Sequence, residues 1–224
     1  MLTAKIAAFV VDTKLKDLPA DVMRGARDAL IDTLGVGLAG TLEPVSEIAL
    51  HWAQELGAKP QSTLWGTRIA SSAAEAAFAN GIAAHALDFD DSHPHVRGHA
   101  SAPMTAVALA VGQVTGASGS EVLAAYALGL EVAGKLGRAM GPGHYLRGWH
   151  STSTIGTFSS TAVAARLWNL SAAETQTALG IAASHILSAA LYPSWWGVHF
   201  YRFLPGAALW IACALLAACA ALAW

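Results

Sequence analysis

The chain has 224 residues, of which 54% are hydrophobic, 12% charged and 8% aromatic, and its formal net charge is −2. This length is sufficient for one large domain or two small ones, each with a proper core. A sequence rich in Ala and Gly but poor in aromatic residues favours packed helices over a β-sandwich. The slight negative charge and the lack of any Lys/Arg cluster argue against nucleic acid as a partner.

Two features bear on the cellular compartment. Cys213 and Cys219 lie in one apolar run, at a spacing that gives neither a disulfide framework nor a zinc site. The N-terminal sequence "MLTAKIAAFVVDTKLKD" lacks the apolar stretch and small-residue cleavage site of a signal peptide. We therefore expect a cytoplasmic protein.

The first half of the chain reads as helices separated by Gly and Pro. An amphipathic helix is expected near residues 3–15, and a second helix starts with Pro19 in its first turn. Helical spacing puts one set of residues on the buried face of this second helix: Met23, Ala26, Leu30, Thr33 and Leu34. The next helix, "PVSEIALHWAQELG", ends at Gly57, and residues 62–65 form a possible short strand.

Three later helices begin with the capping-box spacing, in which a Ser is followed three residues later by a Glu. The pairs are Ser72 with Glu75, Ser118 with Glu121, and Ser171 with Glu174, and they open helices over 72–87, 119–140 and 171–190. Further helices are expected at 102–116 and 152–169. Small residues on these segments would let helix axes approach closely. The prediction is an all-α fold.

The composition changes near the C-terminus. Arg202 is the only fully charged side chain between residues 175 and 224, and residues 203–224 carry no charge at all. This run is long enough for a membrane span, which needs about 20 apolar residues. A buried C-terminal helix explains the same pattern.

The densest polar stretch is "HALDFDDSHPHVRGHAS", residues 85–101, with four of the nine histidines. Metal ligation is one interpretation, but the spacing matches no zinc signature, so we predict neither a metal nor a cofactor. An acid–base site is chemically more natural, because neighbouring carboxylates and imidazoles push their pKa values apart. The third interpretation is that Asp88 and Asp91 cap backbone amides while the histidines are half-exposed.

A second polar cluster lies in "GPGHYLRGWHSTSTIG", where His144 and His150 precede a Ser/Thr run that opens a helix. The free amides and hydroxyls of Ser151 and Thr152 could bind a substrate carboxylate. Arg147 could add a bidentate contact. A plain helix N-cap with solvent-facing His and Arg side chains is the alternative.

Three segments, "FANGIAAHALDFDDS", "GHASAPMTAVALAVGQ" and "GWHSTSTIGTFSSTAVAARLWNLSAAETQTALGIAAS", resemble the MmgE/PrpD family, and the similarity covers residues 4–185. That family includes 2-methylcitrate dehydratase, cis-aconitate decarboxylase and iminodisuccinate epimerase. The resemblance implies a helical domain with a smaller α/β lid domain, a homodimer and metal-independent chemistry. It also implies a small di- or tricarboxylate substrate and proton transfer next to a carboxylate.

The resemblance also assigns residues. Asp88 matches the first aspartate of the family's "DFDD" motif, and Ser92 matches the hydroxyl residue that follows it. His99 matches the next motif histidine, with His95 as the alternative, and His150 matches the histidine of the "G[FW]H" motif. His99 and His150 are the expected proton carriers, with Asp88 and Ser92 orienting them or the substrate.

The sequence departs from the family after "GIAAS". No lysine follows Lys135, although family members have a "KP.H.G" segment there that helps to hold the substrate; His199 and Arg202 are the nearest substitutes. We therefore expect a helical domain over 1–185 without the lid, and an atypical tail over 186–224 that could derive from a frameshift. Three functions remain open: a 2-methylcitrate dehydratase-like lyase, an inactive fragment or dimerising scaffold, and a domain tethered to a membrane through 203–224.

Overall fold

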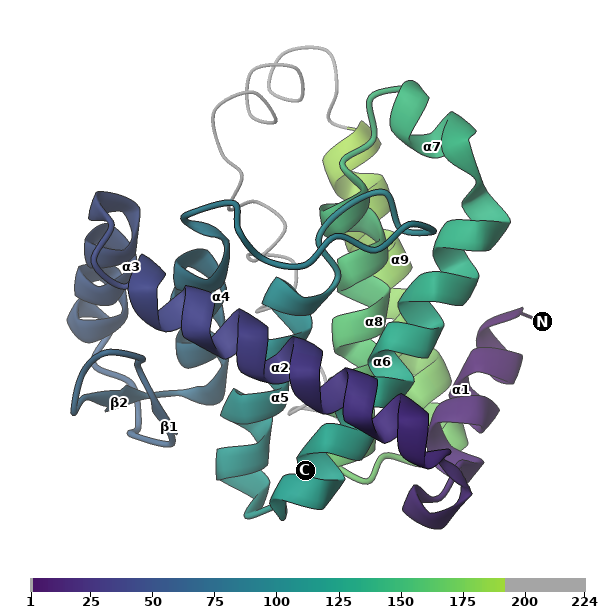
Figure 1. The fold of residues 1–224 in the computed structure, drawn as a ribbon, viewed down its shortest axis with the longest axis horizontal. Coiled ribbons are helices and arrows are strands. Elements are labelled where there is room, and N and C mark those ends of the chain that lie inside the picture. The colour runs from purple at the N-terminus through teal and green to yellow at the C-terminus, as the bar shows by residue number, and fades with distance from the viewer. Residues whose placement is uncertain (1, 192–224) are drawn as a thin grey trace.

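The computed structural model of the protein describes residues 2–191 (Figure 1). The predictions for residues 192–224, which include the apolar run 203–224 and most of the proposed tail, lie outside this range. Among the described residues, none of the helices combines the length and the apolar character needed to cross a bilayer.

Nearly all regular structure in the described range is helical, which confirms the all-α prediction. The α-helices are α1 (Leu2–Asp12), α2 (Ala20–Gly40), α3 (Pro44–Glu55), α4 (Ala73–His85), α5 (Ser101–Thr115), α6 (Gly119–Met140), α7 (Pro142–Leu146), α8 (Ser151–Leu167) and α9 (Ala172–Leu191). The expected strand at 62–65 is shorter, β1 (Ser62–Thr63), and it pairs antiparallel with β2 (Ala70–Ser71), which the sequence analysis did not predict. The short helix α7, which has Pro142 in its first turn, was also missed.

The predicted capping boxes are present at the starts of α4, α6 and α9. Ser72 accepts the amide of Glu75 at 3.3 Å, and the Glu75 carboxylate accepts the amide of Ser72 at 3.2 Å. The same reciprocal pair of bonds joins Ser118 to Glu121 and Ser171 to Glu174. Each box satisfies two backbone amides that a helix start otherwise leaves unpaired.

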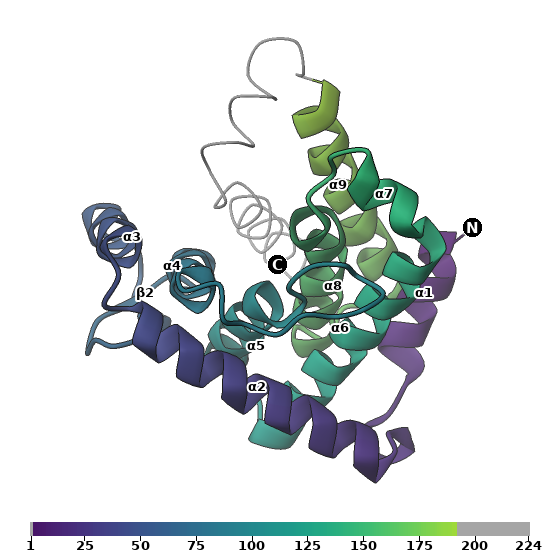
Figure 2. The same cartoon turned by 45° about the horizontal axis from the view of Figure 1, so that its top comes forward.

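Helix α8 lies at the centre of the fold. It contacts α5, α6, α9 and α1, and all its residues except Phe158 and Arg166 are buried (Figure 2). Helix α2 runs across α4, α5 and α6 on one side of the molecule (Figure 1). The expected buried face of α2 is confirmed, with Ala26 and Thr33 fully covered. The helices therefore pack around α8, and many of the core side chains are alanines.

Glycine allows the close helix approaches that the sequence predicted. A Cβ at Gly129 on α6 would come within 2.5 Å of Val163 on α8. A Cβ at Gly40, the last residue of α2, would overlap the carbonyl oxygen of Ala83 on α4. Backbone cannot move aside as a flexible side chain can, so α2 and α4 pack this closely only because residue 40 has no side chain.

We predict that Gly40→Ala lowers the free energy of unfolding by about 1–3 kcal/mol, the usual cost of overpacking. Gly35→Ala on the same helix is the matched control, because a Cβ at this exposed residue would meet no atom within 4 Å. The control should gain about 0.5–1 kcal/mol from the better helix propensity of Ala. Urea unfolding of the three proteins tests this, and equal effects of the two substitutions would contradict it.

Candidate functional site

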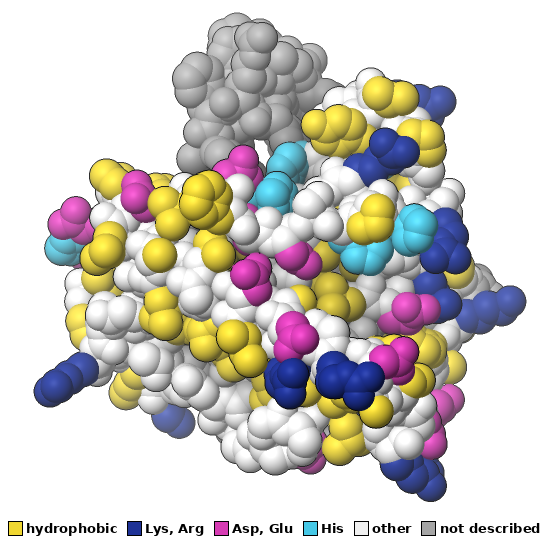
Figure 3. Space-filling view, in the orientation of Figure 1, with side chains coloured by type: hydrophobic (Ala, Val, Ile, Leu, Met, Phe, Trp, Pro, Cys, Tyr) yellow, Lys and Arg dark blue, Asp and Glu magenta, His cyan; other side chains and the backbone are white. Residues whose placement is uncertain are grey.

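The candidate site forms where the C-terminal end of α4 and the N-terminal ends of α5 and α8 come together under the loop of residues 86–100. Histidine side chains gather in the upper half of the face shown in Figure 3, one group of them beside an acidic side chain. Helix α4 ends at His85, which places that ring at the start of the loop. The predicted position of the polar stretch, at a helix end followed by a loop, is therefore confirmed.

Asp91 fixes the end of the loop to α5. Its carboxylate accepts the amide of Ser101 at 2.9 Å and the Ser101 hydroxyl at 2.6 Å. The Ser101 hydroxyl also hydrogen-bonds the buried hydroxyl of Tyr126 on α6. Burial raises the pKa of Tyr126 above its ordinary value, which keeps this phenol neutral. Asp91 thus has the capping role considered in the sequence analysis.

The middle of the loop rests on α6. The Nδ1 atom of His93 accepts the amides of His95 at 3.2 Å and of Val96 at 3.4 Å, which makes a tight turn. A Cβ at Gly137 of α6 would overlap the carbonyl group of His95, so the loop can pack this closely on α6 only because residue 137 is glycine. His93 is thus engaged in building the loop.

Gly98 and Thr152 join the loop to α8. The His99 amide donates to the Thr152 hydroxyl at 2.9 Å. A Cβ at Gly98 would lie 2.7 Å from that hydroxyl and 3.0 Å from the Thr152 amide nitrogen, so only glycine permits this approach. The contact carries His99 to the N-terminus of α8, where His150 is the N-cap residue.

Four side chains of the loop and α4 form one hydrogen-bonded cluster. His85 Nδ1 lies 2.9 Å from Asp90 Oδ1, and His99 Nδ1 lies 3.0 Å from the Asp90 carbonyl oxygen. On its other side, His99 Nε2 lies 3.3 Å from Asp88 Oδ1. The rings of His85 and His99 meet edge to face, with centroids 4.8 Å apart.

The environments of His85 and His150 shift their pKa values in opposite directions. The hydrogen bond from Asp90, supported by its charge, raises the pKa of His85 against the effect of burial. Burial lowers the pKa of His150, and repulsion from His85 and His99 adds to this. The site therefore favours a cationic ring at His85 and a neutral ring at His150.

Hydrogen bonds also set which nitrogen of each proton carrier holds the proton. His99 Nδ1 lies 3.0 Å from the carbonyl oxygen of Asp90 and Nε2 lies 3.3 Å from the Asp88 carboxylate, and both partners are acceptors only. The shorter contact is a hydrogen bond and favours the proton of the neutral ring on Nδ1, which leaves the lone pair on Nε2. His150 Nδ1 accepts the amide of Ser153 at 3.2 Å, so the proton of the neutral ring is on Nε2. One ring thus offers a base at Nε2 and the other a donor at Nε2.

Sequence comparisons identify the family to which this chain belongs. The family model of the MmgE/PrpD N-terminal domain matches residues 4–194. The chain belongs to the MmgE/PrpD family. It is 34% identical to cis-aconitate decarboxylase of Homo sapiens over 189 residues and 32% identical to that of Mus musculus over 191 residues. It is also 30% identical over 189 residues to the cis-aconitate decarboxylase-like protein oryM of Aspergillus oryzae.

The alignments cover most of this chain but less than half of each relative. The human and mouse alignments each cover 82% of this chain but 39% of the relative, and the Aspergillus oryzae alignment covers 81% and 39%. The chain therefore spans much less than half the length of these relatives, and the comparison concerns their N-terminal domain.

The structure of this MmgE/PrpD domain brings some of the predicted site residues together. Asp88, His99, His150 and Thr152 lie around the same helix ends, and Ser151 is buried beside Gly98. Ser92 and Arg147 have exposed side chains, and within residues 2–191 no hydrogen bond or ion pair joins either of them to the cluster.

Two residues of the cluster were missing from the predicted site. His85 and Asp90 belong to the polar stretch, but nothing in their spacing shows that one carboxylate would reach two imidazoles. The motif resemblance led to Asp88, whose side chain is 78% exposed, while the Asp90 side chain is fully buried. The only hint in the sequence was the density of three aspartates in four residues, which suggested that one of them could face inward.

The same four residues are the described set that could hold a metal ion. His85, Asp88, Asp90 and His99 each offer a ligand atom, and these atoms lie within 4.8 Å of one another. Hydrogen bonds already join His85 Nδ1 to Asp90 Oδ1 and His99 Nδ1 to the Asp90 carbonyl oxygen. A cation would have to displace the proton that Asp90 holds on His85.

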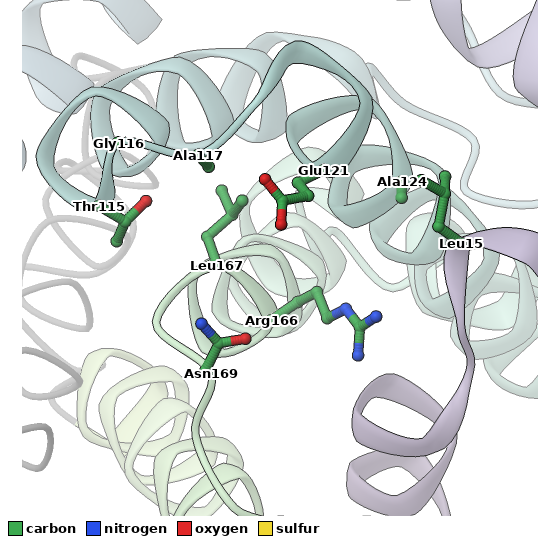
Figure 4. Close-up of a pocket in the computed structure, with 9 residues that line it drawn as sticks. All are labelled: Leu15, Thr115, Gly116, Ala117, Glu121, Ala124, Arg166, Leu167 and Asn169. Atoms are coloured by element: carbon green, nitrogen blue, oxygen red, sulfur yellow. The ribbon is translucent and has the colours of Figure 1, made fainter.

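A separate cavity of about 220 Å³ lies at the opposite ends of α5 and α8, lined by Arg166, Glu121 and Asn169 among others (Figure 4). Arg166 donates to the carbonyl oxygens of Val10 at 3.4 Å and Val11 at 2.8 Å, at the end of α1. The Arg166 guanidinium thus links α8 to α1. This charged group in the cavity lining has a structural role, and the cavity lies far from the histidine cluster.

We predict that His150→Asn makes the protein less sensitive to acid. Asn still caps α8, but it does not titrate. Because the folded-state pKa of His150 is lowered, its neutral ring stabilises the fold above the unfolded pKa, and this stability is lost as the pH falls through the folded pKa. Unfolding free energies at about pH 7.5 and about pH 5 measure the effect. An undiminished loss in the variant would contradict the lowered pKa.

Proposed function

We propose that the protein acts as a lyase on small di- or tricarboxylates, by moving a proton at a carbon next to a carboxylate. The observation that carries this proposal is that His99 and His150 lie at the start of α8 with hydrogen bonds that favour opposite tautomers. Membership of the MmgE/PrpD family supports it. Its relatives named as cis-aconitate decarboxylases make cis-aconitate the first substrate to test.

The chemistry needs a stabilised carbanion and one well-placed proton. Loss of CO2 from such a substrate leaves an electron pair next to a remaining carboxylate, and the carbon must then be protonated. In a dehydration, a base removes the proton from carbon and an acid protonates the departing hydroxyl group. Decarboxylation therefore needs one acid at the carbon, whereas dehydration needs a base at the carbon and an acid at the departing hydroxyl group.

The two histidines fit these roles through their Nε2 atoms. His99 Nε2 carries the lone pair and acts as the base, with the Asp88 carboxylate beside it to stabilise the imidazolium once it forms. His150 Nε2–H is the hydrogen-bond donor to the substrate, and it delivers a proton only from the imidazolium form, which the lowered pKa makes the stronger acid.

One end of the site suits an anionic substrate, because the α8 N-terminus presents the positive end of its helix dipole. The Asp90 carboxylate offsets the positive charge of the His85 ring, and Asp88 is negative, so the substrate carboxylate should bind at the α8 end. Ser151 and Thr152 at that terminus, and the exposed Ser92 and Arg147 near the rim, are the proposed substrate-binding residues. Thr152 already accepts the His99 amide, so it also positions the base.

The reaction type is the finer part of the proposal. Dehydration of 2-methylcitrate, expected from the sequence, uses the same two proton carriers and is the second reaction to assay. We also propose that the protein forms a homodimer and works in the cytoplasm without a cofactor. Binding of the carboxylate without turnover would favour the inactive-fragment alternative.

We predict that His150→Gln lowers kcat for cis-aconitate, and that His99→Gln lowers kcat for dehydration of 2-methylcitrate, by about 10²- to 10⁴-fold, the usual contribution of a general acid or base. Release of CO2 measures the first reaction, and absorbance of the unsaturated product measures the second. His51→Gln is the matched control, because this histidine is exposed on α3 and its nearest acidic partner, Glu47, is 4.0 Å away. Unchanged kcat in both site variants, with the fold intact by circular dichroism, would refute the assigned roles.

A further inference from the structure

Asp90 is an unusual residue for this fold, because among the residues that the structure describes it is the one charged side chain that is buried. Its side chain has no exposed surface. Removing a carboxylate from water is costly unless the charge is paired and hydrogen-bonded. An apolar residue would serve simple packing better, so the contacts of this carboxylate need an explanation.

The contacts of Asp90 lead to two imidazole rings. Oδ1 accepts from His85 Nδ1 at 2.9 Å. The main-chain oxygen accepts from His99 Nδ1 at 3.0 Å, and Oδ2 lies 3.3 Å from the same nitrogen. Oδ2 makes no hydrogen bond to any described residue, so its charge faces the His99 ring without being satisfied by a second donor.

The neighbouring aspartates do different work. Asp91 caps α5 through Ser101, and the mostly exposed Asp88 lies at the outer nitrogen of His99. The backbone at Asp88 has a φ of 55°, in the left-handed region, and this bend separates it from the inward-facing Asp90. Only Asp90 contacts both His85 and His99 from the protein interior.

We propose that Asp90 is the positioning residue of the site: its buried carboxylate orients the His85 and His99 rings and directs His99 Nε2 outward, towards Asp88. The catalytic part of this assignment rests on the proposed function. Within residues 2–191, the other charged or titratable groups that face the two rings are Asp88 on the loop and His150 at the start of α8. Neither can replace Asp90, because Asp88 lies on the outer side of His99 and His150 carries no negative charge.

The test compares Asp90→Asn with Asp91→Asn, which removes the adjacent carboxylate. In Asp90→Asn, the pKa of His85, followed by NMR of its ring protons, should fall towards or below its ordinary value. For dehydration of 2-methylcitrate, in which His99 is the base, kcat should drop by about 10²-fold, as expected for a misplaced catalytic group, with a much smaller change in KM. The pH profile of kcat should change shape as well.

Asp91→Asn should lower the melting temperature and leave the His85 titration where it is, since Asp91 acts on α5. A normal His85 titration and normal kcat in Asp90→Asn would overturn the proposal. If the wild-type chain shows no turnover, the proposed function fails, and the His85 titration alone decides the role of Asp90. If Asp90→Asn does not fold, ring ¹⁵N spectra of the wild type decide it: a proton on His85 Nδ1 at neutral pH supports the assignment, and a lone pair there overturns it.

Discussion

The contact between Gly98 and the N-terminus of α8 is the constraint on which the site depends. Without it, His99 would remain on a loop that belongs to α4 and α5, while His150 belongs to α8. The absence of a side chain at residue 98 lets the Thr152 hydroxyl accept the His99 amide at 2.9 Å. One glycine and one hydroxyl thus bring together residues that are far apart in the sequence.

The central helix makes this contact rigid. Helix α8 is buried along almost its whole length and is fixed by α5, α6 and α9, so its N-terminus is a firm platform for the loop. The loop itself is fixed at its far end by Asp91 on Ser101 and in its middle by its close packing on Gly137. A loop held at three points can keep imidazole rings oriented, which is what acid–base chemistry requires.

The sequence was sufficient to predict the helices, because capping boxes and hydrophobic spacing act over a few residues. It predicted α6 at 119–140, the range that the structure has, and placed the starts of α4 and α9 within two residues. Pairing of β1 with β2 was not predictable, since two-residue strands leave no alternating pattern. The roles of Asp88, Asp90 and Asp91 were not predictable for a different reason: which of three adjacent carboxylates faces inward depends on the left-handed turn at Asp88 and on α6 below the loop.

The opposite protonation of His99 and His150 is the central claim, and ¹⁵N NMR of the ring nitrogens tests it most directly. With the protein uniformly labelled and held at a pH where both rings are neutral, His99 should carry its proton on Nδ1 and His150 on Nε2. This result would mean that the fold prepares a base and a hydrogen-bond donor before any substrate arrives. The same tautomer on both rings would contradict the account, because the two histidines could not then act as a complementary pair.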